Sequence, residues 1–127
     1  MHDAVRDATI AKALSYVPYS GFAMGAAVVT ENNHVIKGSL VENVSLGLSM
    51  CAERVALFSC VANSAGKPEI LALVSKRTKG ALTWPCGACL QVAMELGGED
   101  LLIVVSDGKT QESATLAQLA SRLPHKP

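Results

Sequence analysis

The sequence contains few charged and few aromatic residues. Of its 127 residues, 17% are charged and 4% are aromatic, and acidic and basic residues are equal in number. A formal net charge of zero argues against general affinity for nucleic acid, because phosphate contacts need clustered Lys and Arg. Half of the residues are hydrophobic. The chain therefore has either an unusually complete core or an apolar surface that meets other protein.

Long apolar runs and a secretory leader are also missing. No run of eighteen apolar residues occurs in the chain, which excludes a membrane-spanning helix. The first twenty residues carry Asp3, Arg6, Asp7 and Lys12, unlike the apolar centre of a secretory signal. We therefore expect a reducing, cytoplasmic location, in which the four cysteines do not form two disulfides.

No internal repeat or low-complexity linker divides the chain, so residues 1–127 are predicted to form one domain with its own core. Hydrophobic periodicity and turn residues predict helices and strands. Helices are expected over 3–16, 50–63, 85–95 and 115–122, and strands over 22–30, 35–40, 70–75 and 101–105. Strongly apolar strands are typical of a sheet covered on both faces, and we predict a three-layer α/β/α sandwich with a mixed sheet.

Three of the four cysteines fall in two short motifs. Cys86 and Cys89 form a Cys-x-x-Cys pair, which by itself is compatible with a redox motif, a metal clip or chance. Cys51 supplies a third thiol. Both motifs are expected at helix N-termini, where the partial positive charge favours the thiolate form that binds metal.

The fourth cysteine bears on the type of metal site. Cys60 lies nine residues after Cys51 on the same predicted helix, about 13 Å along the helix axis. One zinc ion with sulfur ligands at about 2.3 Å cannot hold both residues, so Cys60 is predicted to be a core residue. Three protein ligands and one open position would remain, which is the catalytic arrangement of zinc.

Glu53 is the candidate acid–base group, because it follows Cys51 by two residues and a metal-activated water needs a neighbour that accepts its proton. Residues at i and i+2 do not share a helix face. The alternative interpretation is a first-turn carboxylate favoured by the helix dipole. Spacing alone leaves both interpretations open.

The two cysteine motifs together resemble the paired zinc motifs of cytidine deaminases. They read Cys-Ala-Glu-Arg at 51–54 and Pro-Cys-Gly-Ala-Cys-Leu-Gln at 85–91, and the second contains the Pro-Cys-x-x-Cys signature of zinc deaminases. Pro-Tyr-Ser-Gly-Phe at 18–22 and Val-Glu-Asn-Val-Ser at 41–45 are also similar to that family. The resemblance covers about Pro18 to Gln91 and is specific to the small homotetrameric branch.

This resemblance implies the metal ligands and the catalytic residue. Cys51, Cys86 and Cys89 would bind Zn²⁺. Glu53 would take a proton from the attacking water and pass protons to a ring nitrogen and to the departing amine.

The resemblance also implies substrate contacts. Phe22 would lie against the pyrimidine, Glu42 would bind a ribose hydroxyl and the Ala52 main chain would read the base edge. Without the resemblance, Phe22 would be assigned to the core and Glu42 to a solvated loop. Leu40 stands where the family has an Asn that contacts the ribose, and a missing polar partner of a buried hydroxyl costs about 1–3 kcal/mol.

Other positions also depart from the family pattern. Leu46 replaces a Tyr, Trp84 stands where a small residue is more usual, and Leu90 replaces an Arg beside the second cysteine of the pair. Leu40, Leu46 and Trp84 indicate a more apolar and differently shaped substrate site, whereas Leu90 removes a positive charge beside the metal cluster. Because Glu53 is intact, we expect chemistry with altered selectivity and not a dead enzyme.

The function implied by the resemblance is zinc-dependent hydrolytic deamination of cytidine, deoxycytidine or a modified cytidine in pyrimidine salvage. The partners would be a nucleoside-like small molecule and three further copies of the chain, with no nucleic acid and no membrane. A deaminase of a nucleoside antibiotic or free base, and a non-catalytic zinc-stabilised nucleoside-binding paralogue, remain alternatives. Zero net charge and few aromatics disfavour a nucleic-acid-editing enzyme.

Overall fold

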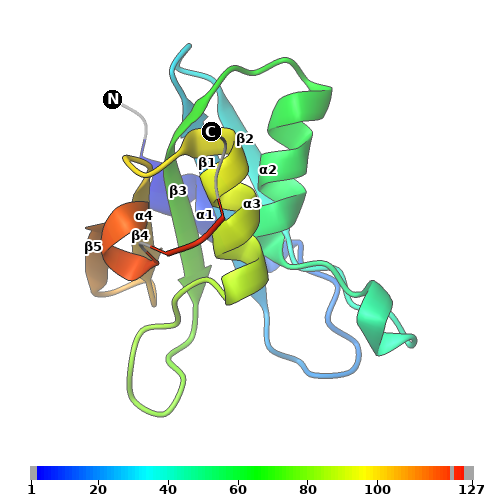
Figure 1. Ribbon diagram of the computed structural model, residues 1–127. Coiled ribbons are helices and arrows are strands. Elements are labelled where there is room, and N and C mark those ends of the chain that lie inside the picture. The colour runs from blue at the N-terminus through cyan, green and yellow to red at the C-terminus, as the bar shows by residue number, and fades with distance from the viewer. Residues whose placement is uncertain (1–2, 121, 125–127) are drawn as a thin grey trace.

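Residues 3–120 and 122–124 are described by the computed structural model of the chain. Their helices and strands, in chain order, are α1 Ala4–Ala13, β1 Met24–Thr30, β2 Val35–Ser39, the short 3₁₀ helix η1 Leu46–Leu48, α2 Ala52–Ala62, β3 Pro68–Ser75, α3 Gly87–Gly97, β4 Leu102–Ser106, β5 Gln111–Thr115 and α4 Leu116–Leu119. Figure 1 shows α2 and α3 side by side, with their N-terminal ends at the same end of the molecule.

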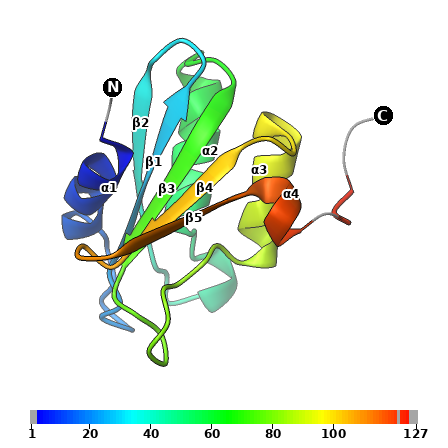
Figure 2. The ribbon, with the colours of Figure 1, turned by 90° about the vertical axis from the view of Figure 1, so that its left-hand side faces the viewer.

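The five strands form one sheet in the order β2-β1-β3-β4-β5 (Figure 2). β3 and β4 are parallel, and every other neighbouring pair is antiparallel. Because parallel strands need a crossover connection, the chain passes through α3 between β3 and β4. The mixed sheet predicted from the sequence is confirmed.

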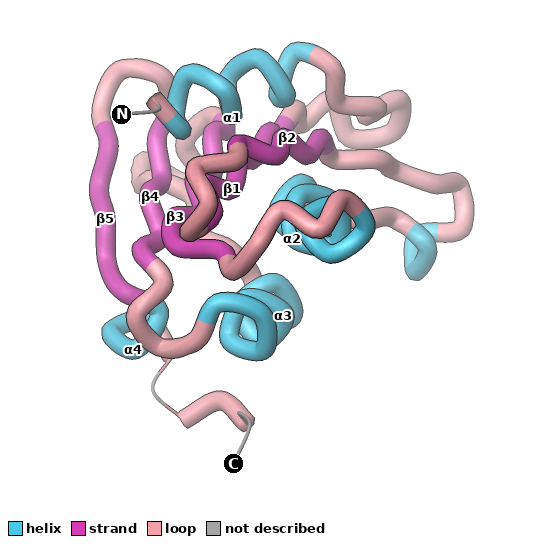
Figure 3. Tube along the Cα trace, turned by 90° about the horizontal axis from the view of Figure 1, so that it is seen from above, coloured by secondary structure: helices cyan, strands magenta, loops and turns pink. Residues whose placement is uncertain are grey.

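Helices cover both faces of this sheet. α1 lies on one face, and α2, α3 and α4 lie on the other (Figure 3). The strands in the middle are buried on both sides, since residues 25–30 of β1 and 71–75 of β3 are all buried. Continuous apolar strands of this kind are typical of a sheet with two covered faces. The predicted three-layer α/β/α sandwich is confirmed.

Gly38 of β2 lets the first turns of α2 lie directly on the sheet. A Cβ atom at Gly38 would overlap the carbonyl oxygen of Ala52 and the backbone nitrogen of Ala56. Rotation of a side chain cannot relieve an overlap with backbone atoms, so a larger residue would move β2 or α2. The small residue therefore determines where the N-terminal end of α2 lies.

The start of α2 differs from the prediction. The helix begins at Ala52, two residues after the predicted start at 50, with Cys51 as its N-cap residue. Met50 forms a β-bridge with Val41, so its backbone is extended and unavailable to the helix. The bridge joins the segment after β2 to the residue that precedes Cys51.

α1 is also shorter than predicted. Asp3 caps it by accepting a hydrogen bond from the Arg6 N–H at 3.0 Å. The helix ends at Ala13 and does not reach Tyr16, because the Tyr16 N–H turns away to donate to Leu40 O at 2.8 Å. In the described part of the chain, no helix has the length and apolar character needed to span a membrane.

The C-terminal region departs most from the sequence prediction. β5 at 111–115 was not predicted, because its residues are polar and mostly exposed and show no apolar alternation. It forms by backbone pairing with the edge of β4. The helix predicted over 115–122 is limited to 116–119, after a capping box formed by Thr115 and Gln118. Residue 121 of the predicted helix lies outside the described residues.

Candidate metal and catalytic site

Two helix N-termini bring three cysteines together. Cys51 is the N-cap residue of α2, Cys86 is the N-cap residue of α3, and Cys89 lies in the first turn of α3. Their sulfur atoms all lie within 4.8 Å of one another, and those of Cys86 and Cys89 are 3.5 Å apart. Tetrahedral zinc with bonds of about 2.3 Å separates its sulfur ligands by about 3.8 Å. The cluster therefore fits zinc.

The cluster favours thiolate at Cys51. A hydrogen bond from the Cys89 thiol and one from Arg54, whose Nη2 lies 3.3 Å from Cys51 Sγ, lower the pKa of the Cys51 thiol to about 5. The same contact with Cys51 and burial raise the pKa of Cys89, because its proton is shared with the neighbouring sulfur. Thiolate is the form that binds metal, and the partial charge of two helix N-termini adds to its stability.

Glu53 is buried beside this cluster. Its side chain is 2% exposed, and burial, together with the negative charge of Cys51, raises its pKa to about 7. The Oε1 atom has no hydrogen-bond partner within residues 3–120 and 122–124. Buried polar atoms are nearly always paired, so an unpaired carboxyl oxygen next to three thiols indicates a place for a bound group. A pKa near neutrality suits a residue that both accepts and donates a proton.

Cys60 lies outside the cluster, as predicted. It is 2% exposed and belongs to the core on the α2 and α3 side of the sheet. Burial raises the pKa of its thiol. The group of potential metal ligands found among the described residues contains only Cys51, Cys86 and Cys89.

The segments that carry the predicted substrate contacts meet at the same end of the sheet. Val41 and Met50 exchange backbone hydrogen bonds of 3.1 and 2.9 Å, and the Leu40 N–H donates to Met24 O at 3.2 Å. The residues after β2 are thereby held next to Cys51 and next to the start of β1, which Phe22 precedes by two residues. The loops before β1, after β2 and after β3 gather at this end (Figure 1).

The predicted substrate residues differ in their exposure and therefore in the surface that a ligand can contact. Glu42 and Phe22 are partly exposed, and hydrogen bonds from Ser20 and Tyr19 lower the pKa of Glu42, so its carboxylate is ionised. Leu40 is half-buried and packs against the core. Ala52 is fully buried, main chain included. The structure does not test these substrate roles, which stay predictions.

Ser20 forms hydrogen bonds with two of the predicted substrate residues, and the sequence alone did not single it out. Its hydroxyl donates to the Glu42 carboxylate and accepts from the Phe22 N–H at 3.0 Å. The signal available in the sequence was its position inside the motif at 18–22. The hydrogen bond to Glu42 joins residues 22 positions apart, and no local pattern predicts such a contact.

Comparison with known proteins agrees with this geometry. Residues 1–105 match the family model of the cytidine and deoxycytidylate deaminase zinc-binding region. The chain is 46% identical over 97 residues to a cytidine deaminase of Mycobacterium tuberculosis strain H37Rv, covering 76% of this chain and 71% of that protein. It is 39% identical over 110 residues to a cytidine deaminase of Halalkalibacterium halodurans, covering 85% and 82%.

Solved structures show the same fold. The crystal structure of cytidine deaminase from Burkholderia pseudomallei superposes with a TM-score of 0.90 at 36% identity, covering 98% of this chain and 100% of that one. The structure of the Mycobacterium tuberculosis cytidine deaminase gives a TM-score of 0.81 at 38% identity, covering 94% and 93%.

Proposed function

The chain belongs to the cytidine and deoxycytidylate deaminase zinc-binding family, and on this premise we propose that it hydrolyses the exocyclic amine of cytidine, deoxycytidine or a modified cytidine. Water adds to the ring carbon that bears the amine, the carbon–nitrogen bond breaks, and the uridine product and the free amine leave. The observation that carries this proposal is the buried carboxyl oxygen of Glu53, unpaired within the described residues and next to three thiols.

Cys51, Cys86 and Cys89 are the residues that would hold Zn²⁺. With no fourth cysteine, histidine or carboxylate in this group among the described residues, the metal would keep an open position, as in catalytic zinc sites. When bound, zinc supplies Lewis-acid activation of the attacking water.

Glu53 moves the protons. Its Oε1 accepts the proton of the attacking water, then delivers a proton to the ring nitrogen next to the reacting carbon. Glu53 then takes the proton of the hydroxyl group that has been added to the carbon and passes it to the leaving nitrogen, so the carbonyl of the product forms as the amine leaves. Burial raises the pKa of Glu53 above the usual carboxyl range, which favours a group that both accepts and donates a proton near neutral pH.

Ammonia release tests the proposal. The zinc-loaded protein is assayed with cytidine, deoxycytidine and an aminated purine, and Glu53→Gln is compared with Glu99→Gln, which changes an exposed carboxylate. Removal of a general acid–base group lowers kcat by about 10²–10⁴-fold, whereas Glu99→Gln keeps wild-type turnover. Zinc content stays at one per chain in both variants. Turnover that survives Glu53→Gln would refute the assigned role.

One observation favours a second class of substrate. Leu40 offers no polar group and packs against the core, so the sugar has fewer hydrogen bonds than the family pattern provides. Ammonia release from cytosine tests whether a free base is preferred, and release of the substituted amine from N4-substituted cytidines tests a modified nucleoside. Nucleoside binding without any release of ammonia would identify a non-catalytic paralogue.

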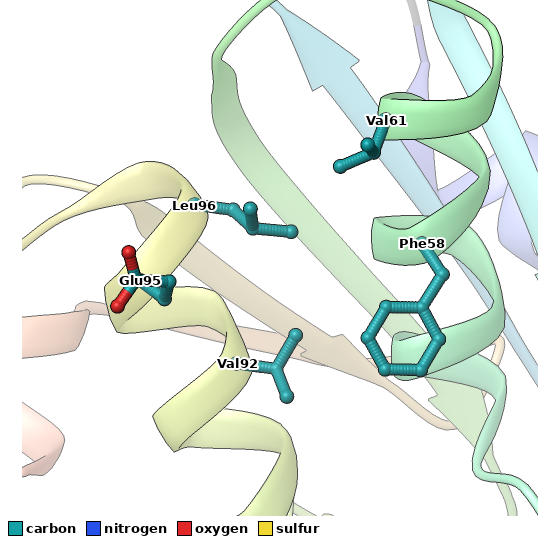
Figure 4. Close-up of a pocket in the computed structure, with 5 residues that line it drawn as sticks. All are labelled: Phe58, Val61, Val92, Glu95 and Leu96. Atoms are coloured by element: carbon teal, nitrogen blue, oxygen red, sulfur yellow. The ribbon is translucent and has the colours of Figure 1, made fainter.

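The proposal includes assembly into a homotetramer. Phe58 and Val61 of α2 face Val92 and Leu96 of α3 across an apolar groove of about 330 Å³ (Figure 4). Phe58 is 46% exposed and Val61 is 63% exposed, on a chain with no net charge. Contiguous exposed apolar surface marks interaction sites. We propose a second copy as the occupant, because a two-fold interface pairs the same apolar patch of both subunits.

The place of action is part of the same proposal. Three cysteines that are free to bind metal require a compartment that keeps thiols reduced. The cytoplasm meets this requirement, and recovery of pyrimidine nucleosides by salvage is the corresponding role. Fractionation of cells that express the full chain, followed by the ammonia assay, tests this location.

A further inference from the structure

The Glu42 carboxylate is hydrogen-bonded within the protein before any ligand arrives. Its Oε1 accepts from the backbone N–H groups of Tyr19 and Ser20, at 3.1 and 3.2 Å. Its Oε2 accepts from the Ser20 hydroxyl. These bonds tie the segment after β2 to the loop between α1 and β1, and they hold the carboxylate in one orientation.

The same Ser20 hydroxyl also holds the backbone of Phe22. Its oxygen accepts a hydrogen bond from the Phe22 N–H at 3.0 Å. A hydroxyl group has one donor and two acceptor sites, so a single group serves both neighbours. The position of Glu42 and that of Phe22 are therefore coupled through one oxygen atom.

The Phe22 ring has a second contact on one face. Lys76 Nζ lies 5.1 Å from the ring centroid, within the range of a cation–π interaction. Lys76 directly follows β3, and Met24 of β1 pairs with the last residue of β3. Ser20 thus holds the backbone of Phe22, and Lys76 contacts one face of its ring. Phe22 is partly exposed.

The Glu42 carboxylate has few hydrogen-bond acceptor sites left for a ligand. A carboxylate has about four acceptor sites. Two on Oε1 and one on Oε2 are taken by Tyr19 and Ser20, which leaves one site for an incoming donor. The carboxylate in this orientation accepts one further hydroxyl group, and the direction of that site depends on the Ser20 bond.

From these contacts we infer that Ser20 is a substrate-positioning residue, which sets Glu42 and Phe22 together and thereby controls substrate affinity. This inference rests on the proposed deaminase function. Ser20 does not contact the reacting atoms, so its removal changes binding and leaves the proton transfers by Glu53 intact. The predicted consequence is a separation of KM from kcat.

Steady-state kinetics with cytidine test the inference. Ser20→Ala raises KM by about five- to tenfold and leaves kcat within about twofold, because one hydrogen bond to a charged group is lost from the binding site. Ser20→Thr retains a hydroxyl group and returns KM to within about twofold of wild type. Ser15→Ala is the matched control, since the Ser15 hydroxyl donates to Lys12 O at the end of α1, and it keeps wild-type values.

A double-mutant cycle separates positioning from independent effects. Phe22→Leu is measured alone and together with Ser20→Ala. If Ser20 acts partly through Phe22, the double variant raises KM by less than the product of the two single effects. If the increase in KM of the double variant equals the product of the two single increases, the inference is overturned. It is also overturned if kcat falls by the same factor as kcat/KM.

Calorimetric binding of cytidine to the zinc-loaded Glu53→Gln protein gives a readout that needs no turnover. Ser20→Ala in this background raises Kd by about five- to tenfold. An unchanged Kd overturns the role of Ser20 while leaving the proposed function standing. Loss of zinc in Ser20→Ala shows a structural role instead, and wild-type protein that neither binds nor deaminates cytidine overturns the inference and the proposed function together.

Discussion

Arg54 donates a hydrogen bond from Nη2 to the sulfur of Cys51 at 3.3 Å, and its buried Nε has no hydrogen-bond partner within the described residues. The guanidinium group is therefore directed at the thiol cluster and not at a carboxylate. Three thiolates around a zinc dication carry net negative charge, which a nearby cation stabilises. With Leu90 in place of a second cation, Arg54 carries this task alone among the motif residues.

Arg54→Gln should weaken zinc binding by about 10–100-fold, as loss of a residue that supports metal ligands commonly does. Competition with a chromogenic chelator measures the change. Arg54→Lys keeps the charge but not the planar donor geometry, and should give an intermediate affinity. Equal zinc affinity in wild type and Arg54→Gln would contradict the stabilising role.

Gly38→Ala should lower the free energy of unfolding by about 1–3 kcal/mol, because the added Cβ overpacks a tight contact with the backbone of Ala52 and Ala56. Urea unfolding of the zinc-loaded protein measures the change. Gly47→Ala is the matched control, since a Cβ at that position meets nothing within 4 Å. A similar loss in both variants would show that the helix–strand contact is not the cause.

Cys60→Ala should retain one zinc per chain and lower the free energy of unfolding by about 1 kcal/mol, since it removes a buried core group. Cys51→Ala should lose the metal, because it removes one sulfur from the three-cysteine cluster. Metal analysis after dialysis distinguishes the two variants. Loss of zinc from Cys60→Ala would contradict its placement in the core.

Phe58→Glu should dissociate the proposed homotetramer, because it places a charge in the apolar groove between α2 and α3. Light scattering at several concentrations measures the mass. Leu14→Glu is the control, because Leu14 is 70% exposed at the end of α1, outside this groove. A wild-type protein that stays monomeric would refute the assembly.

Asp107→Asn should lower the melting temperature at pH 7. Hydrogen bonds from the backbone of Thr110 and Lys109, and from Arg77, lower the pKa of Asp107 in the folded protein. The ionised carboxylate therefore stabilises the fold above its unfolded pKa of about 4, and this stabilisation is lost as the pH falls toward the folded value. The melting temperatures of the variant and wild type should converge in acid, and a constant difference would exclude the charge as its source.

Local patterns predicted most of the fold. The strand over 101–105 is a run of large apolar residues, and the structure has β4 at Leu102–Ser106. β5 was missed because its polar residues form a strand only through the backbone groups of β4. The start of α2 was misplaced because the bridge between Val41 and Met50 competes with the helix, and that bridge joins segments separated by a loop.

The sequence by itself named the candidates for the metal site and its acid–base neighbour, and the family resemblance supplied their roles. The Cys-x-x-Cys pair at a predicted helix start and the exclusion of Cys60 by helix geometry follow from local structure. The approach of Cys51 to that pair requires α2 to pack beside α3. The tertiary structure alone decided the burial of Glu53, the contact of Gly38 with α2 and the bonds of Ser20. These depend on which segments pack together, because burial and long-range hydrogen bonds arise only once distant parts of the chain meet.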